Sequence, residues 1–247
     1  MINMDNYIFD YDQYKKRINK PKKNGFVYII ISIILLLFIA LTLKPSDITK
    51  QEFYFVETGE FMTYKEAQEH ASILQEKGGA GYIYYKNSYH VLAGFYIDYD
   101  SAKSVVENIQ NKFENATIFT HESNKFIQKK ALSSKQNNIL KDTVISNEKL
   151  IENLYNLIIK IDKKELNDSQ IKIEIENLKN DYKIVHEKYF ETFKNEKNLR
   201  ITFENIDSIY SCVLDMKNLN FSTDFSSKIK NILCDIVFTH SALMNLL

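Results

Sequence analysis

Glycine and proline are scarce in this sequence, and both are confined to its first part. The 247 residues include six glycines and two prolines, and neither type occurs in residues 95–247. Hairpins and bulges draw heavily on glycine, so a multi-stranded β architecture is excluded for that stretch. We therefore predict that the second half of the chain is mainly helical.

The chain also lacks a net charge, because 32 basic residues balance 32 acidic residues. Proteins that bind nucleic acid usually carry a basic footprint, so nucleic acid is not expected as a partner. The composition, 45% hydrophobic and 26% charged, excludes a wholly disordered chain. It leaves room for one large domain, or for two small domains and a tail.

Sequence patterns that carry catalytic chemistry are missing as well. There is no HExxH, GxSxG, GxxxxGK or CxxC motif, and the five histidines are scattered singly. We predict that the protein is not an enzyme and that it has no catalytic residue, no metal site and no cofactor. Cys212 and Cys234 are 22 positions apart on separate predicted helices, which is compatible with a disulfide and equally with two free buried thiols.

Residues 26–43 form an apolar run of eighteen residues without a charged side chain. A helix of this length extends over about 27 Å, close to the thickness of the hydrocarbon core of a bilayer. A cleavable signal peptide has a shorter apolar core, and no small-x-small cleavage pattern follows the run. We predict an uncleaved transmembrane helix over residues 25–43 and a linker over residues 44–51.

Basic residues are distributed unequally around this run. Six lie just before it, whereas Lys44 and Lys50 are the only two soon after it. The positive-inside rule then predicts a cytoplasmic tail over residues 1–24 and an extracytoplasmic C-terminus. The expected location is the cell membrane, which the chain crosses once.

Residues 52–121 alternate between strand-like and helix-like segments, with a capping box formed by Thr63 and Glu66 at the start of the first helix. The expected elements are a strand over 52–58 that stops at Gly59, a helix over 63–78, strands over 81–86 and 89–95, a helix after Asp98 or Asp100, and a strand over 116–120. The order βαββαβ predicts an α+β domain of ferredoxin-like or RNP-like topology, in which both helices cover one face of the sheet.

Three strings in this segment resemble the SPOR domain of bacterial division and sporulation proteins. They are FYFVETGEF (residues 53–61), AQEHASILQEKG (67–78) and YHVLAGFYIDYDSA (89–102). They are similar to the family's strand with a Gly-x-Phe ending, its alanine-rich helix that ends in glycine, and the strand that leads into its second helix. Family members are typically single-pass membrane proteins whose external SPOR domain binds peptidoglycan and favours glycan strands stripped of stem peptides. The resemblance covers about 70 of the 247 residues.

Two positions depart from the family pattern. Members often carry Gln where Glu57 stands and Arg where His90 stands, and both positions are associated with the glycan-facing side of the sheet. Whether this chain keeps the glycan affinity is therefore left open by the sequence. From Glu52 to Glu122 there are eleven acidic residues and five lysines, a balance that disfavours polyanionic ligands.

Strand alternation assigns the residues of the sheet to its two faces. If Val56, Thr58, Val91 and Ala93 point toward the helices, the opposite face is expected to stay open. The predicted glycan-binding residues on that face are Phe55, Glu57, Tyr82, Tyr84, His90 and Leu92. Eight of the sixteen tyrosines lie between positions 54 and 99, which suits stacking on sugar rings but is also explained by the strand propensity of tyrosine.

After a polar linker over residues 122–137, apolar residues recur at helical spacing as far as the C-terminus. Three or four helices are expected within residues 138–247, with apolar stripes over 151–161, 175–189, 206–216 and 229–237. Packed together, they would form an all-α bundle. The stripe over 175–189 is also long enough to form a dimer seam.

These observations support two main hypotheses of function. In the first, the protein is a bitopic envelope protein whose external SPOR-like domain binds septal peptidoglycan glycan strands, while the helical region contacts division or sporulation membrane proteins. In the second, the residues of the glycan face are substituted so that it no longer binds glycan, and the protein is a non-enzymatic interaction subunit of a membrane complex in division or sporulation. A cell-wall hydrolase, or its activator, carried by the helical half is a third alternative.

Overall fold

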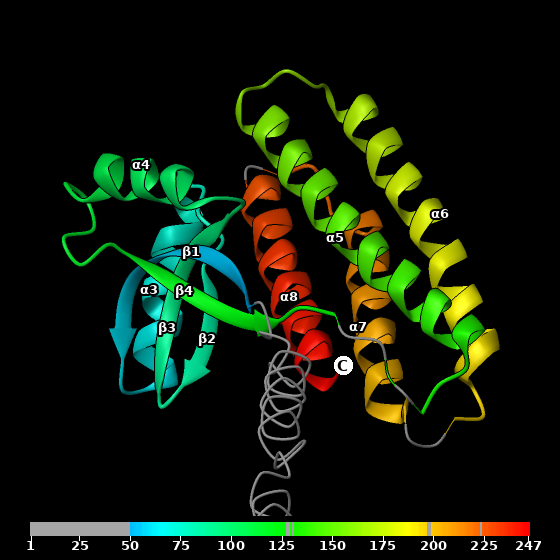
Figure 1. Ribbon diagram of the computed structural model, residues 1–247. Coiled ribbons are helices and arrows are strands. Elements are labelled where there is room, and N and C mark those ends of the chain that lie inside the picture. Colours follow the sequence, from blue (N-terminus) through cyan, green and yellow to red (C-terminus); the bar gives the residue numbers. More distant parts are fainter. Residues whose placement is uncertain (1–49, 127–128, 130, 197–198, 223) are drawn as a thin grey trace, which may run out of the picture. The chain divides into compact units, whose positions relative to one another are not determined.

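The computed structural model describes residues 50–126, 129, 131–196, 199–222 and 224–247. In chain order, the elements are β1 (Lys50–Phe61), α3 (Tyr64–Glu76), β2 (Tyr82–Lys86), β3 (Ser88–Tyr96), α4 (Tyr99–Ile109), β4 (Thr117–Asn124), α5 (Ser134–Asp162), α6 (Asp168–Phe193), α7 (Arg200–Lys217) and α8 (Phe225–Leu246) (Figure 1). Within these residues, the fold is mixed α+β, with one four-stranded sheet and six helices. The prediction of a mainly helical second half is confirmed.

The predicted tail (1–24) and transmembrane helix (25–43) lie outside the described residues. Of the predicted linker over 44–51, the described part is Lys50 and Gln51, which belong to β1. In the part of the chain that the structure describes, no helix combines the length and the apolar character needed to cross a membrane.

The sheet is antiparallel throughout, with the strand order β2-β3-β1-β4. The predicted order of elements, βαββαβ, is confirmed, but β1 does not stop at Gly59. It continues to Phe61, because Gly59 pairs with Val91 inside the ladder. A Cβ atom at Gly59 would lie 2.8 Å from the ring of Phe61, so the glycine serves a close approach within the strand and not its end.

Helices α3 and α4 cover one face of the sheet. Thr63 caps α3 and Asp98 caps α4, each by accepting a hydrogen bond from the backbone N–H three residues later. The core between these helices and the sheet consists of Val56, Ala67, Ala71, Leu74, Val91, Ala93, Ala102, Val106 and Ala116. The small alanine side chains allow the helices to approach the strands closely.

Helices α5 to α8 form a four-helix bundle, in which α5 packs on α6 and α8, and α7 packs on α6 and α8. Capping boxes at Ser133 and Asn167 set the starts of α5 and α6. The second predicted stripe is internal to the chain, since Ile175, Leu178 and Tyr182 are buried in the core of the bundle. These side chains are therefore not free to form the alternative dimer seam.

The bundle and the sheet share one hydrophobic core. Figure 1 shows α8 between the sheet and the other three helices of the bundle. Phe55 and Leu92 of the sheet belong to the same buried cluster as Ile229, Leu233 and Val237 of α8. All described residues accordingly belong to one compact unit, in place of the two domains expected at 52–121 and 138–247.

Both cysteines are free, so the disulfide alternative is not realised in this structure. Burial raises the pKa of the Cys212 thiol to about 12, and the neighbouring carboxylate of Asp235 acts in the same direction. Burial likewise raises the pKa of Cys234. Because the thiolate is the reactive form, both side chains serve as packing groups at neutral pH.

Candidate functional site

The six residues predicted for glycan binding lie on one face of the sheet, the face opposite to α3 and α4. Phe55 and Leu92 are buried in the core shared with the bundle, and Tyr82 and Tyr84 pack against the same core. Glu57 and His90 are joined to each other by a hydrogen bond and lie at the margin of this group. The division of the strands into two faces is thus confirmed by the separate clusters on either side.

The prediction that this face is open was wrong, because α8 covers it. The ring of Phe238 stacks on Phe55 with centroids 4.6 Å apart, on Tyr84 at 4.3 Å and on Tyr82 at 5.5 Å. The three pairs are within 11° of parallel, and Phe55 and Leu92 have no exposed surface. The aromatic side chains that were expected to stack on sugar rings instead stack on a side chain of the same polypeptide.

Polar contacts reinforce the attachment of α8 to the sheet. The Tyr82 hydroxyl donates a hydrogen bond to Asp235 at 3.1 Å, and the His121 Nε2 atom lies 2.8 Å from the Ser241 hydroxyl. Burial, followed by the charge of Asp235, raises the pKa of Tyr82 well above its ordinary value. The phenol is therefore protonated at neutral pH and can donate its hydrogen bond to the carboxylate of Asp235.

The start of α8 is also fixed to the end of α3. Three side chains of α8 donate hydrogen bonds to the backbone carbonyls there: Ser227 to Gln75 at 2.9 Å, Lys230 to Gly78 at 2.8 Å, and Asn231 to Ala80 at 3.1 Å. These carbonyls belong to the last turn of a helix and to the loop after it, where backbone acceptors lack helical partners. Helix α8 is therefore attached both to the end of α3 and to the face of the sheet.

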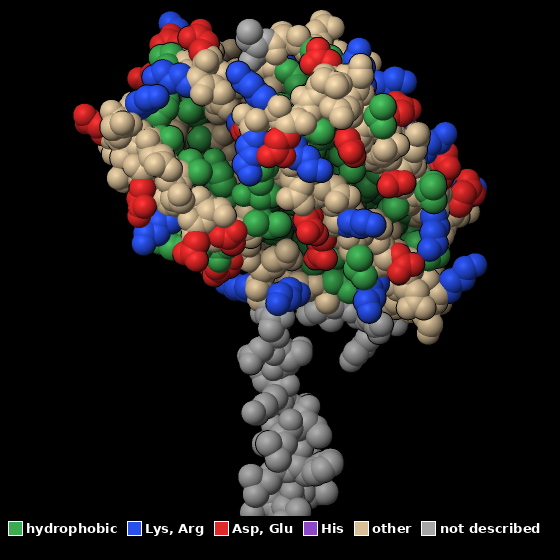
Figure 2. Space-filling view, turned by 90° about the horizontal axis from the view of Figure 1, so that it is seen from above, with side chains coloured by type: hydrophobic (Ala, Val, Ile, Leu, Met, Phe, Trp, Pro, Cys, Tyr) green, Lys and Arg blue, Asp and Glu red, His purple; other side chains and the backbone are tan. Residues whose placement is uncertain are grey.

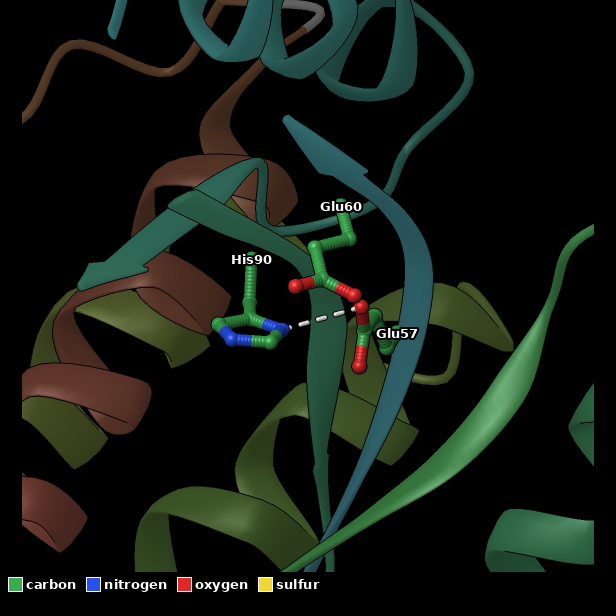
Figure 3. Close-up of side chains that lie close together, drawn as sticks. All are labelled: Glu57, Glu60 and His90. Atoms are coloured by element: carbon green, nitrogen blue, oxygen red, sulfur yellow. Dashed lines mark hydrogen bonds and ion pairs between the residues drawn. The ribbon is translucent and has the colours of Figure 1, made fainter. Parts of the chain in front are cut away.

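Glu57, Glu60 and His90 form a polar cluster on β1 and β3 (Figure 3). His90 Nδ1 lies 3.0 Å from Glu57 Oε1, and His90 Nε2 lies 3.2 Å from the hydroxyl of Ser88. Ser88 also donates a hydrogen bond to Glu60. The two carboxylates and the imidazole can each supply one ligand atom to a metal ion. These three atoms lie within 4.8 Å of one another.

Irregular pairing of β1 with β3 brings the cluster together. Register shifts occur on both sides of Glu57, so that Glu57 pairs with Leu92, Gly59 with Val91, and Glu60 with His90. A bulge changes the direction of side chains along a strand. As a result, two carboxylates only three positions apart have ligand atoms within 4.8 Å of the same histidine. Two of the predicted glycan-binding residues, Glu57 and His90, are hydrogen-bond partners of each other.

Sequence reasoning missed Phe238, Asp235, Glu60 and Ser88. For Phe238 a signal was present, because the apolar residues 236–238 are consecutive and cannot all lie on one stripe. A helix that is apolar on several sides is buried on several sides. For Glu60 and Ser88 no signal was present, since their approach to His90 depends on the two register shifts in β1.

A second buried polar group lies where α8 meets the bundle. Tyr182 donates a hydrogen bond to Asn147 Oδ1 at 2.7 Å, and Asn147 Nδ2 lies 3.4 Å from His240 Nδ1. The other ring nitrogen of His240 is buried without a hydrogen-bond partner. Burial lowers the pKa of His240 to about 4. This histidine is therefore neutral at neutral pH, and its protonation opposes the packing of α8.

In comparisons with known proteins, no protein-family model, no curated protein and no solved structure matches this chain. None of these comparisons supports the resemblance to SPOR domains that the three sequence strings predict.

Proposed function

We propose that this protein is a non-enzymatic interaction subunit of a bacterial cell envelope complex in division or sporulation. In this proposal, residues 25–43 anchor the chain in the cell membrane, and the folded unit lies outside the cell. The sheet is SPOR-like in its order of elements, but its glycan face binds the chain's own C-terminal helix. The helical bundle and the outer surfaces of the sheet domain are then the parts available to partner proteins.

The packing of Phe238 on Phe55, Tyr82 and Tyr84 is the observation that supports this proposal. A glycan strand would need these rings at the surface, and α8 occupies the space in front of them. The distribution of charge agrees with a protein partner and not with a polyanion: on the face drawn in Figure 2, basic and acidic side chains are interspersed.

Sedimentation with purified peptidoglycan tests the proposal. The full-length chain, purified in detergent, is expected to stay in the supernatant both with intact peptidoglycan and with glycan strands stripped of stem peptides. A protein known to bind peptidoglycan provides the positive control under the same conditions. Sedimentation of the full-length chain that increases when stem peptides are removed would contradict the proposal.

Septal glycan binding is the second candidate function, favoured by the three rings that the sheet directs to one face. It requires α8 to leave the sheet, so Phe238→Ala should then sediment with stripped glycan strands while the parent chain does not. Adding Tyr84→Ala to this variant should abolish the gain. Our proposal expects no sedimentation of either variant, with helix content checked by circular dichroism.

The orientation of the chain is tested by protease accessibility. Protease added to intact cells without their wall should remove the region after Lys44, because the basic residues before the apolar run keep the N-terminus inside. A known external protein serves as the digestion control. Survival of the region after Lys44, while that control is digested, would contradict the proposed topology.

A further inference from the structure

The cluster of Glu57, Glu60 and His90 has the composition of a metal-ligand set. It combines one imidazole with two carboxylates, and their ligand atoms lie within 4.8 Å of one another. In Figure 3 the two carboxylates and the imidazole ring face a common point between β1 and β3. Glu60 is exposed whereas Glu57 is buried, so the Glu60 side chain has room on its solvent side to move toward the other two groups.

Charge at this point is not balanced by the protein. Among the described residues, no lysine or arginine forms an ion pair with Glu57 or Glu60, and His90 is the one basic partner of Glu57. Glu57 is nine-tenths buried. A buried carboxylate beside a second carboxylate is costly unless a cation accompanies it. A divalent cation held by both carboxylates would remove this repulsion.

The histidine is oriented in the way that metal-bound histidines usually are. His90 Nδ1 faces the carboxylates, while Nε2 lies 3.2 Å from the Ser88 hydroxyl. A ligating imidazole typically donates its other N–H to an oxygen, which fixes the ring and the tautomer. Ser88 also binds Glu60, so one hydroxyl positions two of the three groups.

The donor types indicate which cation fits. Calcium and magnesium prefer oxygen ligands alone, whereas imidazole together with carboxylate suits zinc and its neighbours in the first transition row. Three protein ligands leave a fourth position for water or for a group from a partner. We propose that Glu57, Glu60 and His90 form a binding site for a divalent transition-metal ion of the zinc type. The site goes beyond the proposed interaction function and does not depend on it.

Isothermal titration calorimetry with Zn²⁺ tests the site. The full-length chain, purified in detergent and freed of metal by a chelator, should bind one Zn²⁺ with a saturable isotherm. Glu57→Gln, Glu60→Gln and His90→Ala should each weaken binding at least about tenfold, the lower end of the range found when a hydrogen-bond partner of a metal ligand is lost. Ser88→Ala should weaken binding less. Ca²⁺ and Mg²⁺ should not compete with Zn²⁺ for the site, so their presence should leave the zinc isotherm unchanged.

Glu122→Gln is the matched control, because Glu122 is a carboxylate on the same sheet that pairs with Lys50 away from the cluster. It should leave the zinc isotherm unchanged. The two glutamine variants keep the size of the side chain, and a thermal unfolding curve without metal shows that each is folded. Absence of zinc binding by the parent chain, or equal binding by the parent, Glu57→Gln and Glu60→Gln chains, would overturn the proposal.

Discussion

Replacing Phe238 by alanine is expected to lower the free energy of unfolding by about 3 kcal/mol, toward the lower end of the range for truncation of packed phenylalanines. The Phe238 ring is only partly buried, but it contacts four rings of the sheet. Three of them are stacked on it, and the fourth, His121, makes an edge contact with centroids 4.9 Å apart. Removal of the Phe238 ring leaves a cavity that the rigid strands cannot close. Denaturant unfolding of the full-length chain in detergent measures the loss.

Tyr85→Ala is the matched control for this experiment. Tyr85 is an aromatic residue on β2 of the same sheet, but 63% of its surface is exposed, and it points away from α8. Its truncation should change the free energy of unfolding by less than about 1 kcal/mol, as is usual for surface positions. Equal losses for Phe238→Ala and Tyr85→Ala would show that Phe238 is not packed between the bundle and the sheet.

Acid is expected to destabilise the protein through His240. Its pKa is about 4 in the folded state and about 6.5 in an unfolded chain, so the unfolded state binds more protons between these values. The stability present above pH 6.5 is therefore lost as the pH falls toward 4, by up to about 3 kcal/mol for the full difference in pKa. His121, whose pKa is also lowered by burial, acts in the same direction at the surface between β4 and α8.

His240→Gln tests this assignment, because glutamine does not titrate and can still accept a hydrogen bond from Asn147. The variant is expected to be less stable than the parent at pH 7, yet to lose less stability between pH 6.5 and 4. His186→Gln, at a histidine that pairs with Asp207 outside the shared core, serves as the control. A parent chain and a His240→Gln variant with identical dependence on pH would contradict the burial of a neutral imidazole at this position.

The sheet could be predicted from sequence because its signals are local. The Thr63 and Asp98 caps, and the alternation of Val56 and Val91 with their neighbours, depend on residues close together in the chain. The four helices of the second half were predicted for the same reason, since a stripe of period three to four needs no knowledge of its partner.

The covering of the sheet by α8 could not be predicted in the same way. Phe238 is more than 180 positions from Phe55, and strand alternation shows only that a face is apolar, not what covers it. An aromatic face is equally suited to a sugar and to a phenylalanine. The apolar residues on several sides of α8 were the one indication that this helix needs a second partner besides the bundle.

The candidate metal site depended on an irregularity that sequence does not encode locally. With regular pairing, Glu57 and Glu60 would lie on opposite faces of β1, because they are an odd number of positions apart. The register shifts around Glu57 change this, and both carboxylates then reach His90. The sequence predicted no metal site because the histidines are scattered singly. Metal-binding motifs are recognised within one element, whereas these ligands are brought together from two strands.

The contact between Phe55 and Phe238 is tested most directly by nuclear Overhauser effects between their ring protons. In the full-length chain with selectively labelled phenylalanine and tyrosine, the structure predicts strong cross-peaks from Phe238 to Phe55 and to Tyr84, whose ring centroids lie 4.6 Å and 4.3 Å away. Phe238→Leu identifies the signals by removing them. A Phe238 ring without cross-peaks to either residue, together with a Tyr84 ring accessible to a soluble paramagnetic probe, would show that the sheet face is open and would contradict the account.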